Sequence, residues 1–307
     1  MEWGFEHIPG LSGKVIIVTG GNSGLGYESA KAFAAKGAEV IMACRSLAKG
    51  EKARGAILKD RPDGRIELMQ LDLGDLESVR RFADSFRERY RRLDVLLNNA
   101  GIMMTPYFKT KEGFEGQFGT NHLGHFALTG LLLDLLLHTD DSRVVNVSSI
   151  AHKKGDIDFD NLQFEDTSEY TRTRAYQRSK LANLLFTYEL QRKLEKAGKK
   201  TISVAAHPGV AMTNLASHLT GKFLYRLFTP LFRMMLQSQA MGALPQIRAS
   251  VDPGVKGGQY YGPGDRKEFR GHPVVVSSTE ASHDQEVAAR LWAVSEKLTK
   301  IGFDFEL

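Results

Sequence analysis

The sequence has almost no cysteine and no long apolar run, and these absences narrow its class. Cys44 is the single cysteine among 307 residues, so no disulfide can form within the chain, which fits a reducing compartment. The nine histidines are scattered without ligand spacing, and we expect no metal site. No run of about 18 apolar residues could span a bilayer, and residues 1–7 lack a charged-then-apolar signal pattern. We therefore expect a cytoplasmic protein.

The charge balance also narrows the class of partner. The net charge is +5 and the sequence pI is about 9.1, so the chain is mildly basic. The lysine pairs Lys153-Lys154 and Lys199-Lys200 are short and typical of solvated surface. We expect a small-molecule substrate and no nucleic acid, and the basic balance is compatible with an anionic cofactor.

Apolar runs alternate with segments of helical period from residue 14 onward, which predicts an α/β fold. The runs are continuously apolar, as expected for strands buried on both faces. We predict a doubly wound parallel sheet of the Rossmann type, with about seven strands and helices on both faces, in a single domain over residues 1–307. The expected strands are 15–18, 39–43, 66–71, 95–97, 144–147, 202–206 and 258–261. The expected helices follow the first strand to residue 36 and then cover 47–59, 76–91, 112–137, a segment ending near 197, and 285–300.

A glycine-rich turn, Thr19 to Gly26, follows the first predicted strand and opens a helix. Glycine lets the backbone approach a pyrophosphate, and the N-terminus of the helix supplies N–H donors and a positive dipole end. The position of the turn within a strand–helix–strand unit favours dinucleotide binding over a plain connection. The candidate cofactor residues in this turn are Gly20, Asn22, Ser23, Gly24, Leu25 and Gly26.

The end of the second strand indicates which dinucleotide binds. An acidic residue there would accept from the ribose of NAD, whereas this chain has Arg45 and Ser46, which can hold a 2′-phosphate. We predict NADP(H), although Arg45 could instead be a solvated loop residue. Asp72 and Leu73 follow the third strand, where Asp72 could accept from the adenine amino group or serve only as a turn residue.

Tyr176 and Lys180 lie one helical turn apart and so share a face. A nearby ammonium lowers the pKa of a phenol, which would make Tyr176 a proton donor or acceptor for alcohol–carbonyl interconversion. Alone the spacing is common by chance. Support comes from Asn98-Asn99-Ala100-Gly101 after the fourth strand and Ser148-Ser149 after the fifth, because ligands bind beyond the carboxyl ends of such strands.

Taken in order, these motifs resemble the short-chain dehydrogenase/reductase family in its compact type. The resemblance extends from about Gly13 to at least Thr213. It depends on Thr19-Gly20…Gly24…Gly26, Asn98-Asn99-Ala100-Gly101, Asn121, Ser148-Ser149, Tyr176…Lys180 and Pro208-Gly209.

The resemblance implies a role for each catalytic candidate. Ser149 would hold the substrate oxygen, and Tyr176 would exchange the proton with it. Lys180 would bind the nicotinamide ribose and lower the pKa of Tyr176. Asn121 would hold a water that relays protons to Lys180. The further cofactor contacts implied are Asn99, Ala100, Gly101, Tyr176, Lys180, Pro208, Gly209, Val210 and Thr213.

One departure from the compact pattern narrows the subgroup. Tyr176 lies 27 residues after Ser149, about twice the usual gap, and the extra segment is 155–174. This segment, Ala43-Cys44-Arg45 and His207-Pro208-Gly209-Val210 resemble the retinol dehydrogenases and the WW-domain oxidoreductases. Membrane-bound members of that subgroup carry an N-terminal anchor, which we do not find here.

Residues 211–241 are expected to cover the active site as a flap. Their apolar and basic residues, including Met212, Met234 and Met235, could line a lipophilic pocket, touch a membrane surface, or form a subunit contact or ordinary core. Peripheral membrane contact and a homo-oligomer are therefore both left open.

The sequence as a whole predicts an NADP(H)-dependent oxidoreductase that interconverts an alcohol with its ketone or aldehyde, on a lipophilic carbonyl. The alternative is a catalytically silent NADP-binding regulatory or interaction protein, which the intact set Asn121, Ser149, Tyr176 and Lys180 disfavours.

Overall fold

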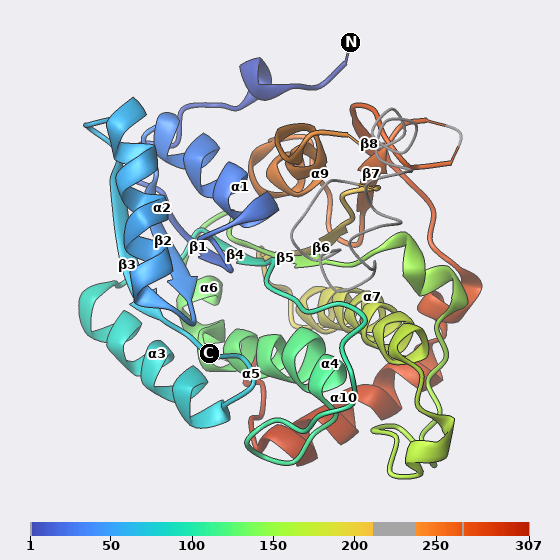
Figure 1. Cartoon of the computed structure of the whole chain (residues 1–307). Coiled ribbons are helices and arrows are strands. Elements are labelled where there is room, and N and C mark those ends of the chain that lie inside the picture. Colours follow the sequence, from blue (N-terminus) through green and yellow to red (C-terminus); the bar gives the residue numbers. More distant parts are fainter. Residues whose placement is uncertain (1, 211–236, 266, 307) are drawn as a thin grey trace, which may run out of the picture.

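A computed structural model describes residues 2–210, 237–265 and 267–306. Eight strands form one sheet in the order β3-β2-β1-β4-β5-β6-β7-β8, all parallel except β8, which is antiparallel to β7 (Figure 1). The strand order reverses between β1 and β4, which is where such sheets bind ligands. The strands are β1 (Val15–Thr19), β2 (Glu39–Cys44), β3 (Arg65–Gln70), β4 (Val95–Asn98), β5 (Arg143–Val147), β6 (Ile202–Ala206), β7 (Tyr260–Pro263) and β8 (Pro273–Val275).

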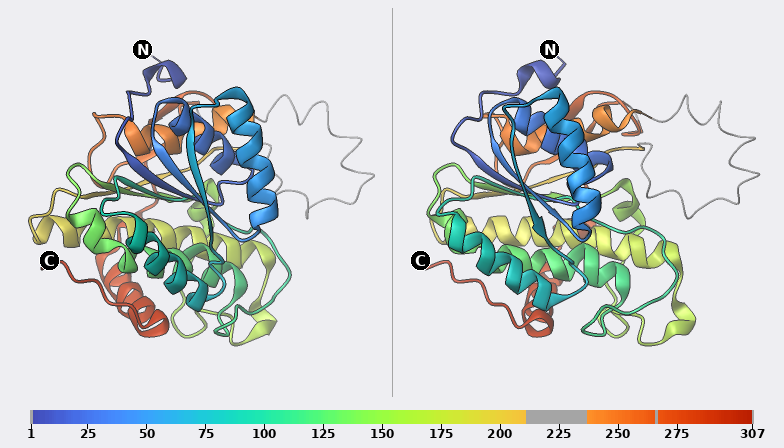
Figure 2. Two further views of the ribbon diagram at one scale, coloured as in Figure 1. Left: turned by 90° about the vertical axis from the view of Figure 1, so that its left-hand side faces the viewer. Right: turned by 60° about the vertical axis from the view of Figure 1, so that its left-hand side comes forward.

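Helices cover both faces of the sheet, as predicted. Figures 1 and 2 show α1, α2 and α9 on one face and α3, α5 and α7 on the other, with α10 outside α7. The helices are α1 (Gly24–Ala35), α2 (Leu47–Asp60), α3 (Leu76–Arg89), α4 (Gly116–Phe118), α5 (Gly124–Leu131), α6 (Leu133–Leu137), α7 (Arg172–Lys196), α9 (Gln239–Val251) and α10 (Gln285–Thr299). Short turns of other helix types are η1 (Phe5–His7), η2 (Gly119–Leu123), η3 (Ile150–Lys154), η4 (Thr167–Glu169) and η6 (Glu280–His283).

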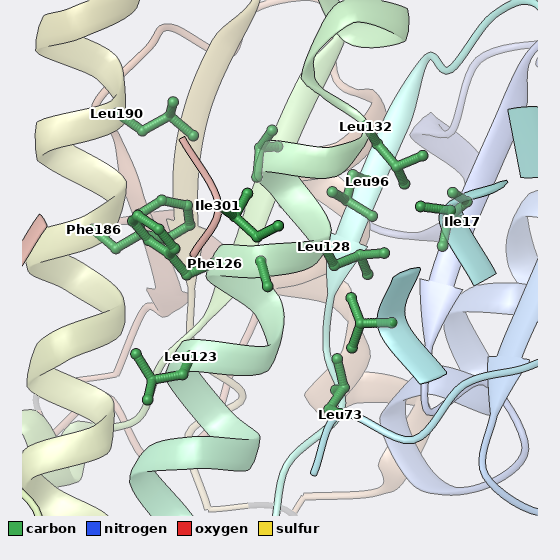
Figure 3. Packing of buried hydrophobic residues seen from close by; sticks show 14 of the residues in the cluster. Ile17, Leu73, Leu96, Leu123, Phe126, Leu128, Leu132, Phe186, Leu190 and Ile301 are labelled. Carbon is green, nitrogen blue, oxygen red and sulfur yellow. The ribbon is translucent and has the colours of Figure 1, made fainter. Parts of the chain in front are cut away.

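Alternate residues of the strands feed two hydrophobic cores, one on each face. Ile16 packs with the α1 and α9 side and Ile17 with the α5 and α7 side, and neither is exposed. Figure 3 shows Phe126 of α5 against Phe186 of α7, with Ile301 beside them. These packed faces hold the strand ends in fixed register, and the site is built on those ends.

The sheet has eight strands where we expected about seven. The seventh strand lies at Tyr260–Pro263, close to the expected 258–261. The additional strand, β8, contains the strand-favouring Val274 and Val275, but it has only three residues and begins at a proline.

Two helical predictions were also inexact. The expected helix over 112–137 begins only at Gly116, because Glu112 accepts a hydrogen bond from Leu76 N (2.7 Å) at the start of α3 instead. The wide π turn η2 then interrupts it, followed by α5 and α6. The stretch between β6 and β7, for which no helix was predicted, contains α9, whose internal Pro245 is typical of a helix break.

Candidate active site

The glycine-rich turn after β1 leads directly into the N-terminus of α1. Ser23 is the N-cap residue of α1, and the predicted phosphate residues Gly20 to Gly26 all lie in this turn and the first helical turn. The turn packs closely, since a Cβ placed on Gly26 would lie 2.5 Å from Gly20 O and 2.6 Å from Asn99 Nδ2. The backbone is therefore shaped to expose its N–H groups to an anion, and the residues fit a pyrophosphate.

Thr19, the last residue of β1, fastens this turn to the end of β4. Its Oγ1 accepts hydrogen bonds from Asn99 N and Ala100 N, each 2.9 Å, and Asn99 Nδ2 donates to Thr19 O at 2.8 Å. His125 Nε2 lies 3.0 Å from Thr19 Oγ1, and Gln246 Nε2 of α9 donates to Asn99 Oδ1 at 3.0 Å. Two of the predicted cofactor segments are thus one rigid unit.

The residues predicted to select the dinucleotide lie at the ends of β2 and β3. Arg45 is exposed, and no described residue pairs with its guanidinium. Ser46 is the N-cap residue of α2 and accepts from Lys49 N at 3.4 Å, which leaves its hydroxyl hydrogen free to donate. Asp72 Oδ1 accepts from Gly74 N at 3.0 Å, so its turn role is present, while its contact with adenine stays a prediction.

Tyr176 and Ser149 meet at the reaction end of the sheet. Ser149 follows β5 and is the N-cap residue of η3, and its side chain hydrogen-bonds to the Tyr176 phenol. Tyr176 is 6% exposed. Burial raises the pKa of Tyr176 to about 12, while the hydrogen bond from Ser149 lowers it. Lys180 is not among the groups that shift this pKa, so the lowering expected from Lys180 stays a prediction.

Lys180 lies one turn further along α7, equally buried. Its Nζ donates to Val147 O at 3.0 Å and lies 5.7 Å from the centre of the Tyr176 ring. Burial lowers the pKa of Lys180 to about 8. A Cβ built on Gly101 would lie 3.6 Å from this Nζ, so the segment after β4 passes directly beside it.

Asn121 lies in the π turn η2 and is fully buried. Its Nδ2 donates to Ile102 O and to Ser179 Oγ, each 2.9 Å, and its Oδ1 accepts from Ile102 N at 2.8 Å. The side chain therefore joins the helix, the segment after β4 and the catalytic helix α7. A π turn is a frequent feature of functional sites, because the wider turn re-aims a side chain.

The turn predicted to face the nicotinamide, Pro208-Gly209-Val210, directly follows β6. It lies at the same sheet edge as Ser149, because β5 and β6 are paired in parallel register. Thr213 and most of the predicted flap, residues 211–236, lie outside the described residues.

Two residues that position the site were not anticipated. Gln117 accepts from Met104 N at 2.8 Å and donates to Tyr170 OH at 3.2 Å. Arg178 is fully buried, donates to Asp156 Oδ2 (2.9 Å) and Leu162 O (2.9 Å), and stacks on Phe164 at 4.4 Å. Arg178 thus ties the segment 155–174 to α7.

Two buried histidines of the region, His122 and His125, are packing and hydrogen-bonding residues. Burial lowers the pKa of His122 to about 3 and that of His125 to about 4, so both stay neutral. Across the described residues, no group of His, Cys, Asp and Glu side chains could hold a metal ion. Within the same ranges, no helix is both long and apolar enough to cross a membrane.

Comparison with known proteins matches this geometry to one group. The family model for short chain dehydrogenases matches residues 14–161. Human retinol dehydrogenase 12 is 41% identical over 96% of this chain and 89% of its own length, and mouse retinol dehydrogenase 14 is 42% identical over 95% and 88%. An uncharacterised Mycobacterium paratuberculosis protein of known structure is 41% identical, covers 99% of this chain and 100% of its own, and superposes with a TM-score of 0.82. A Shigella flexneri short chain dehydrogenase crystallised with NADP shares the fold at 22% identity, covering 82% of this chain and 97% of its own, with a TM-score of 0.63.

Proposed function

Since the chain belongs to the short-chain dehydrogenase family, in its retinol dehydrogenase-like subgroup, we propose that it is an NADP(H)-dependent enzyme acting on a lipophilic carbonyl or alcohol. Membership of this family makes it an oxidoreductase of alcohols and carbonyls. The observation that supports proton transfer by Tyr176 is its buried hydrogen bond with Ser149, with Lys180 one turn away on the same helix.

In the proposed mechanism each side chain has one task. The bound nicotinamide supplies or accepts the hydride. Ser149 donates a hydrogen bond to the substrate oxygen and so orients the carbonyl carbon. Tyr176 gives its proton to that oxygen during reduction and takes it back during oxidation. Lys180, charged below a pH of about 8, favours the phenolate form as the proton leaves.

Asn121 is proposed to hold the water that returns a proton to Lys180. Both hydrogens of its side-chain amide are already donated, to Ile102 O and Ser179 Oγ. Such a water would therefore donate to an oxygen of Asn121.

The cytoplasmic location, peripheral membrane contact and homo-oligomer stay predictions.

Tyr176→Phe tests the chemistry. The ring still fills the buried site, so NADPH binding should change by less than about twofold, while turnover should fall by about 10²- to 10⁴-fold because the proton donor is lost. NADPH absorbance with a panel of aliphatic, aromatic and terpenoid carbonyls measures the rate. Turnover that survives the substitution would show that Tyr176 is not the proton donor. Wild-type protein that binds NADPH and reduces none of the panel would favour the regulatory alternative.

Arg45→Asp tests the cofactor. The exposed guanidinium at the end of β2 is proposed to bind the 2′-phosphate, and a carboxylate there would repel the phosphate and accept from a ribose hydroxyl instead. We expect NADP affinity to fall by about 10- to 100-fold and NAD affinity to rise, measured by fluorescence titration. Equal NADP affinity in the two proteins would exclude this role for Arg45.

A further inference from the structure

His207, the last residue before the Pro208-Gly209 turn, has a buried side chain with a defined tautomer. It is 1% exposed. Gly209 N donates to its Nδ1 at 3.2 Å, so Nδ1 must be the unprotonated, accepting nitrogen. The ring hydrogen is therefore on Nε2, which donates to Glu268 Oε2 at 3.0 Å.

Glu268 extends this contact to a third loop. Its Oε1 accepts from Lys153 Nζ at 2.7 Å, and Lys153 lies in η3, whose N-cap residue is Ser149. The residue after Glu268, Phe269, accepts a hydrogen bond from Val210 N at 2.8 Å through its carbonyl. The loops after β5, β6 and β7 are thus joined by one chain of polar contacts, behind the site.

The backbone conformation of Gly209 makes the Pro208-Gly209-Val210 turn depend on these hydrogen bonds. Its φ is +64°, a conformation that favours glycine, and a Cβ there would lie 2.4 Å from Phe269 O. The turn has no room to relax toward the segment that contains Phe269. Its shape is set by the acceptor that His207 offers to Gly209 N, by the contact of Val210 N, and by Gln237, whose Nε2 donates to Pro208 O at 2.6 Å and whose backbone N donates to Val210 O at 3.2 Å.

We propose that His207 is a positioning residue for the nicotinamide half of the cofactor, held by Glu268 and Lys153 in the tautomer whose Nδ1 fixes the Gly209 turn. This inference rests on the proposed function, because it takes Pro208-Gly209 to be the nicotinamide contact. It adds a residue that does not touch the reacting atoms and acts through the turn.

Protonation of His207 should break the arrangement. An imidazolium carries hydrogens on both nitrogens, so an Nδ1–H would face the Gly209 N–H and two donors would meet. The groups that face the ring are Glu268, Lys153, His152 and the ring of Tyr260, whose centre is 5.1 Å away. Burial lowers the pKa of His207 while the Glu268 carboxylate raises it, and the net direction is downward. The neutral form is therefore the one present at neutral pH.

Two ligands separate the turn from the rest of the cofactor site. NADP⁺ reaches the nicotinamide turn, whereas adenosine 2′,5′-bisphosphate contains only the adenosine end. Both can be titrated into the protein by calorimetry. A variant that only loosens the fold weakens both ligands, while a variant that disturbs the turn weakens NADP⁺ alone.

Two substitutions each remove one of the two hydrogen bonds of His207. His207→Gln can still donate toward Glu268 but offers no acceptor at the position of Nδ1, and we expect NADP⁺ to bind about 10-fold more weakly, the equivalent of one lost hydrogen bond. His207→Asn keeps the acceptor near Gly209 N and loses the reach to Glu268, and a smaller loss is expected. Binding of the bisphosphate should change by less than about twofold. Unchanged NADP⁺ affinity in His207→Gln, or equal weakening of both ligands, would overturn the inference.

The pH dependence gives a signature that a purely structural role would not produce. The 2′-phosphate titration is shared, so it cancels in the ratio of the NADP⁺ dissociation constant to that of the bisphosphate. The 5′-phosphate of the bisphosphate also titrates at about pH 6 and has no counterpart in NADP⁺, so the wild type is compared with His207→Asn at each pH. Relative to His207→Asn, the wild-type ratio should rise as the pH falls from about 8 to 5. Glu268→Gln removes a negative charge from beside the ring, so the rise should move to lower pH. A wild-type ratio that follows the ratio of His207→Asn at every pH would count against the inference, whereas a wild type that binds neither ligand would refute the cofactor proposal itself.

Discussion

The two halves of the sheet edge use buried polar groups in opposite ways. Beside β1 and β4, Thr19 Oγ1 is surrounded by Asn99 N, Ala100 N and His125 Nε2, so its hydrogen-bonding capacity is filled by the protein. Beside β5 and α7, the Tyr176 phenol bonds to Ser149 and the Lys180 ammonium to Val147 O, and neither group makes a further hydrogen bond within the described residues.

The difference shows which half stabilises the fold and which half lowers its stability. A saturated buried network stabilises the fold and fixes the backbone around the pyrophosphate turn. An ammonium with one acceptor is costly to bury, and burial accordingly lowers the pKa of Lys180 to about 8. In the proposed function, the nucleotide half is already ordered for the cofactor, and the donors of the reaction half are free to bind substrate and cofactor.

The largest effect is expected from a substitution in the nucleotide half, beside β1 and β4. Gly26→Val would push a side chain into Gly20 O and Asn99 Nδ2, both within 2.6 Å of the new Cβ. Because neither neighbour can move without breaking the Thr19 network, we expect a loss of about 3 kcal/mol in unfolding free energy and no measurable NADP binding. Urea unfolding and fluorescence titration measure the two.

The matched control is Gly55→Ala in α2, where an added Cβ meets nothing within 4 Å. It should leave cofactor binding unchanged and stabilise the protein by up to about 1 kcal/mol. If Gly26→Val behaved like this control, the nucleotide half would be far less rigid than the comparison implies.

In the reaction half, beside β5 and α7, a substitution is expected to raise the unfolding free energy instead of lowering it. Lys180→Met removes the buried ammonium, and Val147 O keeps a hydrogen bond from Asn183 Nδ2 at 3.1 Å. The variant should lose activity yet gain about 1–3 kcal/mol in unfolding free energy at pH 7. The folded pKa of Lys180 is about 8 against an ordinary value of 10.5, so the cost of its burial is complete below pH 8 and fades toward pH 10.5. The gain should therefore shrink over that range.

Thermal unfolding of both proteins between pH 7 and about pH 10 checks this prediction. A less stable variant, or a gain that does not depend on pH, would mean that Lys180 is well accommodated and would remove the contrast between the halves.

The smallest effect is expected at the border of the nucleotide half. Gln246→Leu leaves Asn99 Oδ1 without the donor that now lies at 3.0 Å, although Asn99 keeps both of its bonds to Thr19. We expect a loss of about 1 kcal/mol in unfolding free energy and an NADP affinity lowered by about threefold or less. Denaturant unfolding resolves this difference. A larger loss of affinity would place Gln246 within the cofactor site itself.

The amino-acid sequence was informative wherever one residue determines the local backbone. The apolar runs predicted the parallel strands, Gly20 and Ser149 lie just after two of those strands, and Tyr176 lies inside a predicted helix. The edge strand β8 was missed because its three residues are shorter than an ordinary strand, although they include two valines. Helix α9 was missed because Pro245 lies inside it.

The buried partners of the site were harder to foresee. Arg178 belongs to a polar stretch of α7 and reads as a surface residue, yet Asp156, Leu162 and Phe164 enclose it completely. Only the folding of the 155–174 segment creates that environment. The long gap between Ser149 and Tyr176 was visible in the sequence, but its attachment to the catalytic helix was not.

The number of residues in the segment Gly119–Leu123 matters, because this segment forms a π turn. A π turn contains one residue more than an α turn, so it changes the phase of a helix by about 100°. Deleting Thr120 would restore α-helical phase and rotate everything before it relative to α5. Gln117 would then turn away from Met104 N, and the segment after β4 would lose its support. The geometry of this site therefore depends on a count of residues as well as on their identity.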